Sequence, residues 1–290
     1  MITRLGLIVL RLLYRLLGAR ALGRLGAALG GLIYYLPNWR RRVGETNLRL
    51  CFPEKSAAER RRLLKAHYRA FFRATLQEAV SWWGSKDEVE ALTQIEGFEH
   101  VAPHIGKPLI ILAPHFIGLN IVAVRLSLVH SPTVSIYARI KNPVIARLIQ
   151  HARSRFGPIE LYDKREGVKP VLRAIRRGLP FYYLPDLDHG RRDAVFAPFF
   201  GVPAATLTGL PRIAALTGAV VVPCVAEQTA ECYVARFYPA WADYPSGDLE
   251  ADVRRMNAFI EERVRERPEQ YFWLHQRFKT RPPGEAPLYD

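Results

Sequence analysis

His115 and Asn120 form the most informative pair of polar residues, at the end of the segment Leu109-Ile-Ile-Leu-Ala-Pro-His115-Phe-Ile-Gly-Leu-Asn120. Histidine titrates near neutral pH, so it can take the proton of a hydroxyl group while that hydroxyl attacks a carbonyl carbon. A second side chain, usually a carboxylate, must hold the imidazole in the tautomer that accepts this proton. The pair is therefore a candidate for acyl transfer to a hydroxyl, although the spacing alone is a weak signal and a lone histidine at such a position is more often structural.

The elements around this pair predict an α/β fold. Short apolar runs alternate with amphipathic segments after residue 93, and two of these runs are apolar throughout, as in buried parallel strands. We expect strands at 109–113, 133–138, 180–184 and 219–225, and helices at 119–128, 143–156, 168–177 and 249–265. This alternation predicts a mostly parallel central sheet flanked by helices. Before residue 90 the chain is expected to be helical, with one long helix from the capping box Ser56-Ala-Ala-Glu59 to about Trp83.

Several other segments combine apolar and polar residues in a consistent order along the chain. They are Asn47-Leu-Arg-Leu-Cys-Phe-Pro-Glu54, Tyr137-Ala-Arg139-Ile-Lys141-Asn142-Pro143, Arg153-Ser-Arg155-Phe-Gly157, Pro185-Asp186-Leu-Asp188-His-Gly190-Arg-Arg192, Val195-Phe-Ala-Pro-Phe-Phe-Gly201, Thr206-Leu-Thr-Gly209 and Trp273-Leu-His275-Gln-Arg277-Phe-Lys279-Thr-Arg281-Pro-Pro-Gly284. Together with Pro-His-Phe-x-Gly at His115, they resemble the motifs of the lipid A late acyltransferases, the lauroyl/myristoyl transferase family. The resemblance runs from about residue 38 to 284. Each motif is modest alone, but the ordered set is specific.

The resemblance implies a glycerolipid-acyltransferase-like fold with N-terminal helices that dock on a membrane. It also implies transfer of a fatty acyl group from acyl carrier protein to a hydroxyl of a lipid A precursor, in lipopolysaccharide biosynthesis. His115 would be the general base, and no covalent acyl-enzyme is needed because no Ser or Cys motif stands beside it. No cofactor is expected, since the acyl donor is carried on the phosphopantetheine of the carrier.

The resemblance further implies a set of substrate-binding residues. Cationic members would pair with phosphates on the sugar acceptor or on the carrier arm, and Phe199, with Phe196 and Phe200, would line an acyl-chain slot. The expected set is Arg139, Lys141, Asn142, Asp186, Arg192, Phe199 and Thr206. Alternatives stay open, because single arginines are often solvated, Asp186 could cap a turn and the phenylalanines could be core.

Asn120 departs from the family pattern, in which the first motif ends in Asp or Glu. An amide oxygen can accept the imidazole N–H, but it cannot stabilise the imidazolium by charge, and its NH₂ group can favour the wrong tautomer. In the serine protease triad, the change from Asp to Asn lowers turnover by about 10⁴. Three interpretations stay open: another carboxylate nearby, weak activity, or deliberate inactivation. Asp186 and Asp188 are the nearest candidate acids by motif.

Charge and composition narrow the class of partner. The net charge is +15, and most of the cations are arginine. Hydrophobic residues make up 49% of the sequence, which is enough to form a large core. Arginine suits phosphates and anionic lipid heads, although a GC-rich genome would produce the same bias. The charges are spread along the chain without a base-stacking module, so nucleic-acid binding ranks last. Cys51, Cys224 and Cys232 form no pair or metal spacing, which fits a reducing compartment.

The N-terminal segment predicts location. Residues 1–36 are apolar but interrupted by arginines, with Arg4, Arg11 and Arg15 on one helical face and Arg20 and Arg24 near the opposite face. We therefore expect a break after residue 18 and a helical segment that lies in an anionic membrane interface. The alternative is a helix that only packs on the domain. The longest charge-free run is shorter than the roughly 20 residues of a membrane span.

These observations predict a membrane-docking segment at 1–36 and an acyltransferase domain at 37–290, on the cytoplasmic side of the inner membrane. The expected partners are acyl carrier protein, a phosphorylated glycolipid acceptor and the membrane surface. Two alternatives stay open: an enzyme of the same fold with another glycolipid or glycerolipid acceptor, and an inactive membrane-bound homologue. The acyl chain length, the acceptor hydroxyl and the oligomeric state are not encoded in a readable pattern.

Overall fold

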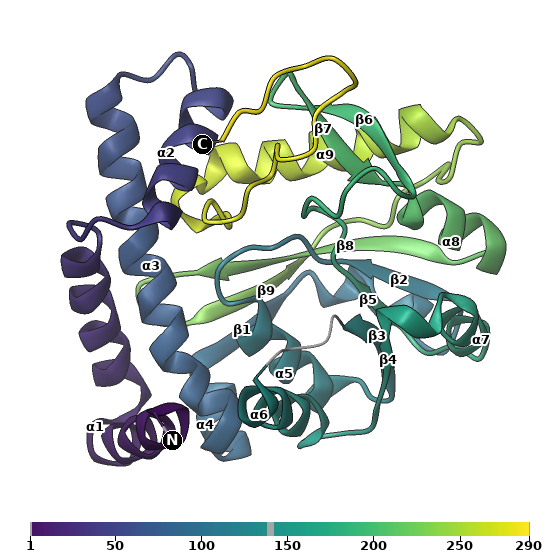
Figure 1. Cartoon of the computed structure of the whole chain (residues 1–290). Coiled ribbons are helices and arrows are strands. Elements are labelled where there is room, and N and C mark those ends of the chain that lie inside the picture. Colours follow the sequence, from purple (N-terminus) through teal and green to yellow (C-terminus); the bar gives the residue numbers. More distant parts are fainter. Residues whose placement is uncertain (1, 138–141, 290) are drawn as a thin grey trace.

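A computed structural model describes residues 2–137 and 142–289 and shows the expected α/β architecture (Figure 1). Among these residues, the central sheet has the strand order β1-β9-β8-β2-β5-β3-β4. The strands are β1 (Thr93–Glu96), β2 (Leu109–Leu112), β3 (Thr133–Tyr137), β4 (Ile159–Asp163), β5 (Phe181–Tyr183), β8 (Val220–Gln228) and β9 (Tyr233–Phe237). Every neighbouring pair is parallel except β8 and β9, so the prediction of a mostly parallel sheet is confirmed.

Helices cover both faces of the sheet, with α5 and α6 on one side and α9 on the other (Figure 1). The helices of this region are α5 (Leu119–Val129), α6 (Pro143–Ser154), α7 (Lys169–Arg176), α8 (Gly209–Thr217) and α9 (Leu249–Glu266). The expected helices at 119–128, 143–156, 168–177 and 249–265 are all present. Strands β1, β4 and β9 and the antiparallel hairpin of β6 (Ala194–Phe199) and β7 (Val202–Leu207) were not expected. Short 3₁₀ helices lie at Phe98–His100, Ala102–His104, Lys164–Glu166 and Pro268–Gln270.

The N-terminal region is helical, as expected. It consists of α1 (Ile2–Ile33), α2 (Trp39–Cys51), α3 (Ala57–Trp83) and α4 (Lys86–Leu92). The predicted capping box is present, because the Ser56 side chain accepts from the Glu59 N–H and the Glu59 carboxylate accepts from the Ser56 N–H. The expected break in α1 is also confirmed, because Gly18 has φ 71° and ψ 170° and divides the helix into two halves.

The second half of α1 runs beside α3 (Figure 1). Glycines make this close packing possible: a Cβ on Gly26 would lie 2.4 Å from the Phe72 carbonyl oxygen, and one on Gly30 would lie 2.3 Å from that of Tyr68. Exposed apolar side chains lie in both halves of α1, including Leu5, Leu16 and Leu32. No helix among residues 2–137 and 142–289 combines the length and apolarity needed to cross a bilayer. The domain boundary after residue 36 falls in the turn between α1 and α2 and stays a prediction.

Helix α2 lies against the segment of the chain that follows α9 (Figure 1). The buried Asn47 side chain of α2 donates hydrogen bonds to the carbonyl oxygens of Trp273 (2.7 Å) and His275 (2.8 Å). The C-terminal segment then contacts the loop after β2 through a β-bridge between Phe116 and Tyr271. This contact places Phe272 beside His115, the candidate catalytic residue.

Candidate active site

His115 and Asp186 come together because they follow two neighbouring parallel strands. In the sheet, Leu112 of β2 pairs with Tyr183 of β5, and each polar residue lies three positions after the paired residue. The carboxyl ends of parallel strands meet at one edge, where open α/β sheets place their sites. The His115 Nδ1 lies 2.7 Å from Asp186 Oδ1, and the His115 backbone N–H donates to Asp186 Oδ2 at 2.9 Å.

The surroundings of Asp186 favour its ionised form. Burial alone would raise the pKa of this fully buried carboxyl, but the charge of His115 and two hydrogen bonds from it lower that pKa below its usual range. A carboxylate at Nδ1 makes that nitrogen the donor and leaves Nε2 as the proton acceptor. The His115 side chain is 21% exposed, so a substrate can reach the ring.

Asn120 lies in the first turn of α5, and its side chain is hydrogen-bonded to an acid that was not among the candidates from the sequence. The Asn120 Nδ2 donates to Glu78 Oε1 of α3 at 3.0 Å. Burial raises the pKa of Glu78 to about 7, against the opposing effects of the Asn120 hydrogen bond and the Arg153 charge. The sequence offers only a weak signal for Glu78: it is an acid beside the apolar residues Ala79 and Val80 in an amphipathic helix.

Two largely apolar cavities meet at His115 and Asn120, which line both. The first, here called the α3 cavity, has a volume of about 340 Å³ and lies between α3 and the 115–120 turn, with walls that include Phe71, Glu78 and Phe272. The second, here called the sheet cavity, also has a volume of about 340 Å³ and lies between α5, α6 and the strands β3 and β5. Both volumes fall in the usual range for small-molecule sites. An imidazole at the junction of two apolar cavities suits a reaction between two molecules with hydrocarbon chains.

A family profile described as bacterial lipid A biosynthesis acyltransferase matches residues 1–280. The chain belongs to this family. It is 31% identical over 271 residues to the lipid A biosynthesis lauroyltransferase of Escherichia coli (strain K12), covering 92% of this chain and 88% of the relative. It is 33% identical over 272 residues to a lipid A biosynthesis acyltransferase of Haemophilus influenzae, covering 92% and 83%. It is 30% identical over 253 residues to the lipid A biosynthesis myristoyltransferase of E. coli K12, covering 86% and 78%.

In this family member, Asp186 contacts the catalytic candidate directly and Asp188 does not. The Asp188 carboxylate instead accepts hydrogen bonds from the Thr280 N–H (2.7 Å), the Thr280 hydroxyl (2.8 Å) and the Gly190 N–H (2.9 Å). Its backbone N–H donates to His275 Nε2 at 3.0 Å. Asp188 therefore ties the loop after β5 to the C-terminal segment. Of the two acids considered from the motif, the geometry supports Asp186 as the partner of the ring.

Three residues expected to bind substrate lie outside both cavities at His115. Arg192 is 95% exposed and pairs with Asp193 at 3.6 Å. Phe199 is fully buried in the core, and the Thr206 hydroxyl accepts from Arg277 Nη2 at 2.9 Å. None of Arg192, Phe199 and Thr206 lines the α3 cavity or the sheet cavity. Their roles in substrate binding stay predictions.

Of the three expected substrate-binding residues at 139–142, the structure describes only Asn142. Asn142 is the N-cap of α6, because its Oδ1 accepts from the N–H groups of Val144 (3.0 Å) and Ile145 (3.3 Å). Its Nδ2 donates to the Thr3 hydroxyl at 3.1 Å, which links α6 to the start of α1. Arg139 and Lys141 lie outside the described residues. The substrate-binding roles of all three stay predictions.

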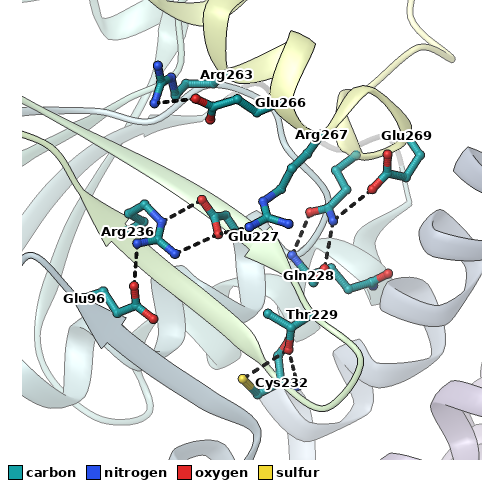
Figure 2. Close-up of polar contacts among 11 residues, drawn as sticks. Glu96, Glu227, Gln228, Thr229, Cys232, Arg236, Arg263, Glu266, Arg267 and Glu269 are labelled. Atoms are coloured by element: carbon teal, nitrogen blue, oxygen red, sulfur yellow. Dashed lines mark hydrogen bonds and ion pairs between the residues drawn. The ribbon is translucent and has the colours of Figure 1, made fainter.

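A polar network anchors the segment that carries Phe272 (Figure 2). Glu227 of β8 accepts from Arg236 at 2.8 Å and pairs with Arg267, just after α9, at 3.0 Å. Next to it, Gln270 and Gln228 exchange hydrogen bonds of 2.7 and 2.8 Å. The Phe272 N–H then donates to the His115 carbonyl oxygen at 3.1 Å, and the two rings stack with centroids 6.5 Å apart. The network thus holds one face of the imidazole against an apolar wall.

Proposed function

We propose that this protein transfers a fatty acyl group from acyl carrier protein to a hydroxyl of a lipid A precursor, as a late acylation in lipopolysaccharide biosynthesis. The observation that carries the proposal is the His115–Asp186 pair at the junction of two apolar cavities. Membership of the lipid A acyltransferase family and the lauroyl- and myristoyltransferase relatives support this acceptor class.

In the proposed reaction, His115 Nε2 takes the proton of the acceptor hydroxyl as its oxygen attacks the thioester carbonyl carbon. A tetrahedral intermediate forms, and backbone N–H groups or arginines stabilise its oxyanion. When the C–S bond breaks, the imidazolium returns the proton to the carrier thiolate, so that an ester and a free thiol result. Asp186 stabilises the imidazolium in between. The step needs no resident cofactor, because the acyl group arrives activated on phosphopantetheine.

We further propose that the protein docks on the cytoplasmic face of the inner membrane through α1 and the α1–α2 turn. Apolar side chains of this region, such as Leu12, Leu16 and Leu32, are exposed and alternate with exposed arginines such as Arg11 and Arg15. Such a surface binds anionic lipid through apolar burial and charge together. Arg139, Lys141 and Arg192 would meet phosphates of the acceptor or of the carrier arm.

The test is an acyl-transfer assay with acyl carrier thioester and a tetra-acylated lipid A precursor, read by mass spectrometry of the lipid. Wild type is expected to add one acyl group, and His115→Ala is expected to lose at least about 10²-fold in rate, the usual contribution of a general base. His104→Ala, in the short helix Ala102–His104, is the matched control and should keep its rate. Equal rates for wild type and His115→Ala would refute the mechanism. If the protein acylated glycerol phosphate and not the lipid A precursor, the proposed acceptor would be wrong.

A further inference from the structure

A third cavity adjoins the site on the side away from the sheet. This α1–α2 cavity has a volume of about 560 Å³ and lies between the α1–α2 turn, α3 and the C-terminal segment. Phe71 and Phe272 line both this cavity and the α3 cavity. Their rings stack with centroids 5.9 Å apart, and Phe272 in turn stacks on His115. The two cavities therefore share these two rings as a common wall, and side by side they extend from the α1–α2 turn to His115.

One face of α3 forms the common wall of both cavities. The lining residues Tyr68, Phe71, Thr75, Glu78 and Trp82 follow one another at intervals of three and four, which places them on one side of the helix. From the first to the last, this face is about 21 Å long, at a rise of 1.5 Å per residue. One leaflet of a bilayer core is about 15 Å thick. The α3 groove, meaning these two cavities and their common wall, is long enough for the whole acyl chain of a membrane lipid.

The outer end of the α3 groove has the composition of a lipid interface. Leu36 and Trp39 line it and are 60% and 52% exposed. The Arg40 guanidinium lies over the Trp39 ring at 4.5 Å, and Arg42 is exposed nearby in α2. Exposed leucine and tryptophan beside cations match the apolar chains and the anionic head groups of a bilayer surface. The sheet cavity also has basic and aromatic lining residues, including Arg153 and Tyr182, but none of its described lining residues is an exposed large apolar side chain.

We propose that the α3 groove seats one fatty acyl chain of the anionic lipid acceptor and guides its hydroxyl from the bilayer to His115. The inference rests on the proposed function, because it assumes a lipid acceptor. It assigns the two sides of His115 to different substrates: the acceptor chain occupies the α3 groove, and the sheet cavity is left for the donor chain. The wall shared with the α3 cavity at His115 and the exposed apolar rim with its cations are the observations that select the acceptor.

Photocrosslinking tests the location of the chain without relying on turnover. The probe is a phosphorylated disaccharide lipid with hydroxyacyl chains, one of which carries a diazirine, in vesicles of phosphatidylethanolamine and phosphatidylglycerol. We expect labelling of Tyr68, Phe72 and Leu274, suppressed by excess unlabelled lipid. Labelling of Ala123 and Leu126 in the sheet cavity instead would overturn the assignment, as would labelling confined to the outer face of α1.

A matched pair of variants tests the same groove by kinetics in detergent. Leu36 lines the groove, whereas Leu216 in α8, also an exposed leucine, lines neither of its two cavities. Leu36→Asp should raise KM for a long-chain acceptor by about tenfold or more, because a carboxylate would face the chain. It should leave KM for a short-chain hydroxyacyl acceptor unchanged, and Leu216→Asp should leave both KM values unchanged. Equal effects of the two variants would overturn the groove.

The two arms separate this inference from the proposed function. If wild type transfers no acyl group but the probe labels Tyr68 and Leu274, the groove stands and the proposed reaction fails. If transfer is normal but the label lies in the sheet cavity, the reaction stands and the groove assignment fails.

Discussion

Replacing Asp186 by Asn should remove most of the turnover while leaving the protein folded. Both carboxylate oxygens of Asp186 accept hydrogen bonds, one from His115 Nδ1 at 2.7 Å and one from the His115 backbone N–H at 2.9 Å. Asparagine has only one oxygen. Because the backbone N–H can only donate, it takes the amide oxygen, and the NH₂ group must face Nδ1. The ring then accepts at Nδ1 and carries its proton on Nε2, where it cannot act as a base.

The magnitude follows from the loss of both the tautomer and the charge. We expect kcat to fall by about 10⁴, as in the equivalent change of the serine protease triad, which corresponds to a barrier higher by roughly 5 kcal/mol. KM should change little, because Asp186 lines neither the α3 cavity nor the sheet cavity. Folding should lose only about 1–3 kcal/mol, because both hydrogen bonds are kept but no longer involve a charged acceptor.

The assay is steady-state acyl transfer from carrier thioester to the lipid A precursor, with thermal unfolding measured on the same samples. Asp188→Asn is the matched control, because Asp188 binds Thr280 and Gly190 and does not contact the ring. Its kcat should stay within a few-fold of wild type. If a folded Asp186→Asn protein kept more than about a tenth of the wild-type kcat, the carboxylate would not set the tautomer, and the proposed role of Asp186 would be wrong.

Three further outcomes follow from the structure. The pKa of Glu78 is raised from 4.5 to about 7, so the contribution of this carboxyl to stability is present below pH 4.5 and is lost as pH rises through 7. Glu78→Gln should therefore raise the free energy of unfolding at pH 8 by up to about 3 kcal/mol, measured by urea titration. At pH 4 the same variant should leave the free energy of unfolding unchanged. Asn120→Asp places a second carboxyl 3.0 Å from Glu78, so one of the two stays protonated; kcat should not rise, and a tenfold gain would show that the acid at position 120 supports the ring. Gly30→Ala puts a methyl group 2.3 Å from the Tyr68 carbonyl oxygen and should lower the free energy of unfolding by about 1–3 kcal/mol. Gly6→Ala is the control and should leave that free energy unchanged, because a Cβ there has nothing within 4 Å. Equal melting temperatures for the two variants would contradict the close packing of α1 on α3.

Local patterns in the sequence determined most of the elements of this protein. The capping box at Ser56, the apolar runs of β2, β5 and β8 and the break at Gly18 depend on residues within a few positions of one another. Such patterns reflect backbone conformation and the periodicity of one buried face, so they can be read before the fold is known. The same holds for His115, whose place at the end of an apolar strand predicted its place at the sheet edge.

Only the tertiary structure decided which acids serve the site. Asp186 reaches His115, 71 residues away, because β5 lies next to β2 in the sheet. Glu78 reaches Asn120 because α3 packs against α5. Neither neighbour relation is a local property, since strand order and helix packing follow from how all apolar faces are buried together. The same reason places Phe199 and Thr206 in the core and outside both cavities at His115, although they belong to motifs of the same set.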